Sequence, residues 1–208
     1  LPGYGESDAP EIQGGQFSFY AQVLADLIHA LGEASAHVVG LATGGAVGIV
    51  MAAKFPQVVD RLVLVSSAGG LPVFSVAPTE GVKHIRDYYR NEGATREKMR
   101  AYLECVIFDQ SAITDELVEE RFHASLNNRS DEGARTPEPV VELLPQVAAA
   151  TLLVWGRDNR VQGYDMALIM LNKIPNVEMH IFGATGLWVP WERQKRFESL
   201  LVDFLDGE

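Results

Sequence analysis

The segment from His37 to Lys54 constrains the fold of this chain more than any other. Apolar residues lead into Gly40, a tight turn follows, and a helical pattern of small residues begins at Gly44. This order predicts a strand, a sharp turn and a helix, and the two glycines let the strand and helix backbones approach each other without a Cβ. Ala42 is then expected to project at the top of a sheet, where its methyl group offers no oxygen for chemistry.

Strand and helix patterns alternate on both sides of this segment. Residues 61–66 form a continuous, β-branched apolar run, which is typical of a parallel strand covered on both faces. A strand, a helix and a second strand with short connections imply a right-handed βαβ unit. We predict an α/β fold, a mainly parallel sheet flanked by helices, with strands over 36–41, 61–66, 151–155 and 177–182 and helices over 17–31, 44–55, 164–173 and 191–205.

The middle of the chain has few strand signals and carries most of the long charged side chains. Thr95 and Thr114 are placed as helix N-caps, so we predict three or four short helices inserted between two strands. The polar residues 127–137 are expected to form a mobile loop. The predicted division is a first part of the core, a helical insertion and a second part of the core, over 1–70, 71–146 and 147–208.

Composition limits the classes of function. The chain has 208 residues, of which 47% are hydrophobic, so it can bury the core of one domain. Its net charge of −11 disfavours nucleic acid and anionic membranes as partners. The single cysteine, Cys105, rules out an internal disulfide framework. We expect a cytoplasmic protein with a small-molecule partner, and a homodimer stays open.

Seven segments together carry a family resemblance. The chain resembles the α/β-hydrolase superfamily, and within it the meta-cleavage product hydrolases, which break a carbon–carbon bond in ring-fission products of aromatic catabolism. The opening residues match a loop that follows a strand in this family, which implies that N-terminal strands are missing from the chain. The residues that carry the resemblance are 1–8, 40–44, 155–158 and 186–192, together with the lid-like segments 78–83, 108–111 and 114–122.

The resemblance implies a catalytic triad in the order Ser, Asp, His. The acid position holds Asp158, whereas the nucleophile position holds Ala42 and the histidine position holds Leu187. Since the remaining acid has no imidazole to orient, we predict that efficient serine-type hydrolysis is excluded.

The same resemblance assigns further site residues. Thr43 follows the nucleophile position, and its backbone N–H would form half of an oxyanion hole. Leu41 stands where the family usually has a polar residue. Arg121 matches a lid arginine that binds the substrate carboxylate or its dienolate, and Trp188 matches an aromatic residue beside the missing histidine.

Two readings of the replaced residues stay open. Ala42 alone would fit an engineered knockout of a serine enzyme. Leu41 and Leu187 favour natural divergence, because an engineer rarely replaces three positions, two of them by leucine.

The retained residues also have structural alternatives. Asp158 could accept backbone N–H bonds or pair with Arg157 or Arg160, or it could face a pocket as a neutral acid. Arg121 could be solvated and Trp188 could belong to the core.

No cofactor and no metal is expected from the sequence, because we find neither metal-ligand spacing nor a phosphate loop. Cys105 is interpreted as a small buried apolar residue. His123 is the histidine nearest to Arg121 in sequence, but residues two apart on a helix point to different faces.

The leading hypothesis is therefore a non-hydrolytic small-molecule enzyme of cyclase, isomerase or lyase type, acting on an apolar, polyketide-like compound in a pocket under the lid. One alternative is a non-catalytic protein that binds a ligand or partner. The other is a residual or engineered-inactive carbon–carbon hydrolase.

Overall fold

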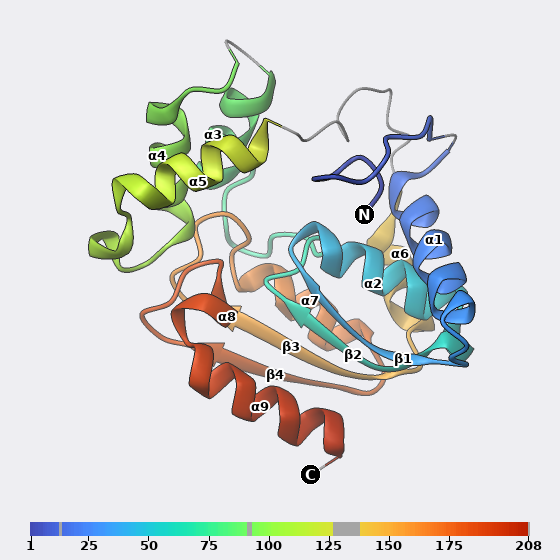
Figure 1. The fold of residues 1–208 in the computed structure, drawn as a ribbon. Coiled ribbons are helices and arrows are strands. Elements are labelled where there is room, and N and C mark those ends of the chain that lie inside the picture. The colour runs from blue at the N-terminus through green and yellow to red at the C-terminus, as the bar shows by residue number, and fades with distance from the viewer. Residues whose placement is uncertain (13, 91–92, 127–137, 208) are drawn as a thin grey trace.

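The computed structural model describes residues 1–12, 14–90, 93–126 and 138–207 (Figure 1). The expected loop over 127–137 lies outside the described residues. The sheet has four parallel strands in the order β1-β2-β3-β4, which confirms the predicted parallel α/β architecture. Their bounds are Ala36–Leu41 for β1, Val59–Val65 for β2, Ala150–Gly156 for β3 and Val177–Phe182 for β4.

Helices cover both faces of this sheet, as Figure 1 shows with α9 on one side and α1, α2 and α7 on the other. Helices cover both faces of β2. Leu62 and Leu64 therefore pack towards α1, α2 and α7, while Val63 and Val65 pack towards α9. The helix bounds are Gln16–Ala30 for α1, Thr43–Lys54 for α2, Val140–Leu143 for α6, Asp165–Lys173 for α7, Val189–Glu192 for α8 and Gln194–Asp206 for α9.

Of the helices that lie between β2 and β3 in the sequence, α3, α4 and α5 pack together beyond the carboxyl ends of the strands (Figure 1). The Thr95 hydroxyl accepts a hydrogen bond from Lys98 N and the Thr114 hydroxyl from Leu117 N, which confirms both predicted N-caps. The helices share a hydrophobic cluster separate from the two sheet faces. Their bounds are Glu80–Arg90 for α3, Arg96–Val106 for α4 and Asp115–Ser125 for α5, and 3-10 turns cover Pro56–Val58, Gln110–Ala112 and Leu144–Gln146.

The predicted C-terminal helix is divided at Arg193, where φ of −130° separates α8 from α9. The predicted division at residues 70 and 146 stays a prediction, and α6 packs with α2 in the core. No helix in the described ranges is long and apolar enough to cross a membrane.

A distant carboxylate caps α1. Glu138 accepts hydrogen bonds from the backbone N–H groups of Phe17 and Ser18, 121 and 120 positions earlier, which would otherwise lack acceptors in the first helical turn. Gly15 makes this possible, since a Cβ there would lie 2.2 Å from the carboxyl carbon of Glu138. The sequence analysis did not identify this cap.

Candidate functional site

The turn between β1 and α2 holds Ala42 at φ 49° and ψ −115°, a conformation that residues with a Cβ rarely adopt. Backbone hydrogen bonds hold the turn in place. The Ala42 N–H donates to the Val65 carbonyl at 3.0 Å, and the Ala42 carbonyl accepts from Ala68 at 2.9 Å. The turn therefore keeps a strained backbone of the kind that functional sites store, although its side chain is a methyl group.

The two glycines around the turn have different roles. A Cβ on Gly40 would lie 2.4 Å from the carbonyl oxygen of Gly44, so the predicted close approach at position 40 is confirmed. At Gly44 the prediction is wrong, because a Cβ there would meet no atom within 4 Å. The second crowded position is Gly45, whose added Cβ would lie 2.1 Å from Oγ of Ser67.

Thr43 is the first residue of α2, so its N–H has no acceptor within the helix. Its side chain is exposed, and position 43 therefore offers a backbone donor beside the Ala42 methyl group. Leu41, the last residue of β1, is half-buried and packs against the cluster that faces α9.

Leu187 is buried at 3% exposure in the hydrophobic cluster of α3, α4 and α5. Its N–H donates to the Val106 carbonyl at 2.7 Å, at the end of α4. Gly186 allows this close contact, since a Cβ there would lie 2.1 Å from the same oxygen. The residue at the histidine position thus joins the C-terminal loop to the helices.

Asp158 lies just beyond β3, and its N–H donates to the Thr185 carbonyl at 3.0 Å. Of the two arginines considered for it, Arg157 pairs with it, with Nη2 lying 3.2 Å from Oδ2, whereas Arg160 pairs with Glu80. Oδ2 is shielded from solvent and accepts no well-formed hydrogen bond from the described residues. Asp158 also lines a surface pocket of about 430 Å³, together with Ile107, Phe108, Gln110, Asn159 and the two arginines.

Arg121 on α5 is exposed, and its guanidinium lies 5.3 Å from the centre of the Trp188 ring. Within the described ranges no carboxylate pairs with Arg121, which leaves its charge available for an anion. Trp188 is half-buried and packs against the same cluster as Leu187. The structure therefore brings these two predicted residues together and holds Leu187 beside them.

In the part of the chain that the structure describes, no serine or threonine hydroxyl bonds to an imidazole. His123 pairs with Glu119 at 3.3 Å on the exposed side of α5. Ser66 lies near the turn at φ 45°, but its hydroxyl is buried and has no hydrogen-bond partner among the described residues.

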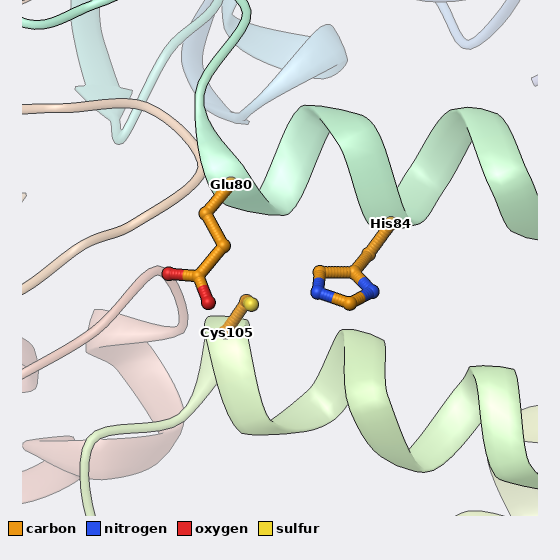
Figure 2. A group of neighbouring side chains, drawn as sticks. All are labelled: Glu80, His84 and Cys105. Atoms are coloured by element: carbon orange, nitrogen blue, oxygen red, sulfur yellow. The ribbon is translucent and has the colours of Figure 1, made fainter.

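Two sets of residues with clear interactions were missed by the sequence analysis. Glu192 accepts hydrogen bonds from the N–H groups of Phe108 and Gly186, both at 2.9 Å, and burial raises the pKa of its carboxyl group. Glu80, His84 and Cys105 converge between α3 and α4 (Figure 2). No metal-ligand spacing in the sequence indicates this group, because its third donor comes from a different helix, and the expectation of no metal stays a prediction.

Comparison with known proteins agrees with this geometry. Residues 1–194 match the alpha/beta hydrolase fold family. The chain belongs to the α/β-hydrolase fold family, and within it stands close to the meta-cleavage product hydrolases.

The similar relatives include a 2-hydroxy-6-oxononadienedioate/2-hydroxy-6-oxononatrienedioate hydrolase from Burkholderia vietnamiensis, 32% identical, with 98% of this chain and 74% of the relative covered. The Escherichia coli K12 protein of the same name has the same identity and coverage. A meta-cleavage product hydrolase from Pseudomonas fluorescens IP01, a serine-to-alanine mutant complexed with acetates, superposes with a TM-score of 0.84 at 28% identity. That alignment covers 100% of this chain and 78% of the other.

Proposed function

We propose that this chain is a non-hydrolytic small-molecule enzyme of cyclase, isomerase or lyase type that binds an apolar, acid-bearing compound between the turn at Ala42 and the helices α3 to α5. In this proposal the helices α3 to α5, within the predicted insertion 71–146, act as a lid over the compound. The Thr43 N–H and the N-terminus of α2 stabilise negative charge that develops on a substrate oxygen.

Two observations taken together carry the proposal, the backbone conformation at position 42 and the packing of the side chain at position 187. The turn keeps its strained backbone around Ala42, and Leu187 packs into the lid cluster where an imidazole would have to stand. A methyl group and a buried isobutyl group can shape an apolar pocket, but neither can carry or transfer a proton.

The charge on Arg121 supports the ligand class. Its guanidinium stacks on Trp188 and has no carboxylate partner among the described residues, so it can bind the carboxylate of a ligand whose apolar part lies towards Leu41 and Leu187. The relatives are named as hydrolases of dienedioates, which are compounds of this charge class.

The proposal can be tested with 2-hydroxy-6-oxononadienedioate as the probe. A change in its absorbance on addition of the protein reports binding, and the masses of the products report the reaction. We expect binding by the full chain, followed by a product of unchanged mass or by fragments whose masses add up to that of the probe. Fragments that together contain one added water would show hydrolysis and overturn the non-hydrolytic role. Absence of binding would overturn the pocket.

The Ala42→Ser, Leu187→His double variant tests the loss of the triad in the same assay. It restores the residue types of a serine nucleophile and its base beside Asp158. We expect it to gain water-adding cleavage that the wild type lacks, with Ala42→Ser alone as the matched control. A wild type as hydrolytic as the double variant would contradict the proposal.

A second candidate is a non-catalytic binding protein, and the pairing of Asp158 with Arg157 favours it. The Asp158 carboxylate is engaged by the guanidinium of Arg157, so the one acid that the proposed site retains already has a structural partner. Recovery of the bound probe unchanged after prolonged incubation would support this candidate against the enzymatic one.

A further inference from the structure

Three potential metal ligands meet between α3 and α4. Glu80 and His84 lie four positions apart on α3, so both side chains leave the same face of the helix. Cys105 comes from the last turn of α4, and Figure 2 shows all three side chains in the space between the two helices. One carboxylate oxygen, one imidazole nitrogen and the sulfur all lie within 4.8 Å of one another.

We propose that Glu80, His84 and Cys105 form a binding site for a thiophilic divalent cation of the Zn²⁺ type, which links α3 to α4. An oxygen, a nitrogen and a sulfur donor make up a ligand set that Zn²⁺ favours. Three protein ligands leave the fourth tetrahedral position for water.

The spacing suits such a site. The zinc–ligand lengths of about 2.0–2.3 Å place neighbouring donors of a tetrahedral site roughly 3–4 Å apart. The donors here lie within 4.8 Å, so a closure of about 1 Å completes the site. Glu80 is exposed and His84 half-exposed, and such side chains can make that shift by rotating without repacking of the core.

The thiol faces a carboxylate in this arrangement. Burial raises the pKa of the Cys105 thiol, and the negative charge of Glu80 raises it further, so the free thiol is a poor nucleophile. Binding of the cation replaces the S–H bond by a sulfur–metal bond and releases the proton to solvent.

Arg160 sets the orientation of Glu80. Its Nη1 lies 3.4 Å from Oε2 of Glu80. Its Nη2 donates a hydrogen bond to the backbone carbonyl of Glu104, the residue before Cys105. With Oε2 facing Arg160, Oε1 is the oxygen that can turn towards the cation. Carboxylates that bind metals are commonly hydrogen-bonded by outer residues in this way.

The site would stiffen the structure next to the residues of the proposed function without depending on that function. Cys105 directly precedes Val106, whose carbonyl oxygen accepts the Leu187 N–H. A cation that fixes the end of α4 therefore also fixes the loop that carries Leu187 and Trp188.

Titration of the full chain with Co²⁺, a spectroscopic substitute for Zn²⁺, tests the proposal. We expect a thiolate-to-cobalt charge-transfer band that saturates at one equivalent and is removed by Zn²⁺. The Cys105→Ser variant should lose the band, and His84→Gln should bind about tenfold or more weakly. Since Glu80 is exposed, Glu80→Gln keeps the fold and supplies an independent variant that should also weaken binding.

The α5 helix offers the matched control. Glu119 and His123 have the same four-residue spacing and lie 3.3 Å apart, but they belong to no three-donor cluster in the described ranges. His123→Gln should leave the cobalt band unchanged. A wild type without the band, or a band that survives in Cys105→Ser, would overturn the proposal, as would equal losses in His84→Gln and His123→Gln.

Discussion

The backbone N–H of Leu187 donates to the carbonyl oxygen of Val106 at 2.7 Å, and this bond joins the C-terminal loop to the end of α4. The Leu187 side chain continues the same contact into the cluster of α3, α4 and α5. Position 187 therefore helps to hold the helices over the sheet, which is a structural role for this leucine.

Truncation of this side chain should destabilise the protein. We expect Leu187→Ala to lower the free energy of unfolding by about 2–5 kcal/mol, because the buried methyl groups leave a cavity. Urea unfolding measures this loss. Leu171→Ala on α7, where the leucine is 39% exposed, is the control and should cost much less. Equal costs would contradict the structural role of Leu187.

Alanine substitution should have different effects on stability at the two glycines of the turn. Gly40→Ala places a Cβ 2.4 Å from a backbone carbonyl oxygen, which cannot move as a side chain can, so we expect a large loss of thermal stability or a failure to fold. Gly44→Ala meets open space within α2 and should be neutral or stabilising by up to about 1 kcal/mol. The reverse order of melting temperatures would contradict the observed packing.

The strained backbone of Ala42 predicts a stabilising substitution. Its conformation costs about 1–3 kcal/mol for a residue with a Cβ, and glycine adopts it freely. After the higher entropy of unfolded glycine is subtracted, we expect Ala42→Gly to stabilise by about 1 kcal/mol in chemical denaturation. Ala46→Gly, inside α2, should destabilise by about 1 kcal/mol or more. A change of the same sign in the free energy of unfolding for both variants would contradict backbone strain at Ala42.

The anionic ligand predicted for Arg121 can be tested with a matched arginine. Arg121→Gln removes the charge beside Trp188 and should weaken binding of the dienedioate probe about tenfold or more, because a charged hydrogen bond is lost. Arg96→Gln is the control, since Arg96 stacks on Phe122 and pairs with Glu119. Fluorescence titration should show unchanged affinity for that variant. Equal affinity of all three proteins would exclude Arg121 from the binding site.

The hydrogen bonds of the Asp165 carboxylate should make the free energy of unfolding depend on pH. Burial alone would raise the pKa of its carboxyl group, but hydrogen bonds from the Ser75 hydroxyl and from the backbone N–H groups of Ser75, Phe74 and Val73 outweigh it and lower the pKa to about 2. Because the unfolded state holds the proton more tightly, this contribution is complete above pH 4 and is lost as the pH falls towards 2. A shift of this size corresponds to roughly 2 kcal/mol.

The measurement compares variants, since other carboxyl groups titrate in the same range. Unfolding free energies of the wild type and Asp165→Asn should differ most at neutral pH and converge between pH 4 and pH 2. Asp203 is exposed, so Asp203→Asn is the control, and its free energy of unfolding should follow that of the wild type across this pH range. A constant difference between wild type and Asp165→Asn across this range would contradict the role of these hydrogen bonds.

Local patterns in the sequence determine much of the fold. The continuous apolar run in β2 and the helical spacing in α1 are patterns of neighbouring residues. Patterns of this kind predict β1 and β4 to the residue and most other predicted elements to within two. The spacing of Gly40, Ala42 and Gly44 likewise predicts a sharp strand-to-helix turn of the hydrolase type, with alanine at its centre. The N-cap residues Thr95 and Thr114 act within one helical turn, and local sequence is sufficient to predict them.

Other features depend on how distant elements dock. Glu138 caps α1 only because the segment that precedes α6 lies beside the start of α1, and Cys105 reaches Glu80 and His84 only because α4 lies against α3. Leu187 is buried because the loop meets α4. These contacts join residues far apart along the chain, and no periodicity encodes them. The sequence alone therefore determined the framework and the alanine at the turn, while the tertiary structure decided the cap, the three-donor cluster and the packing at position 187.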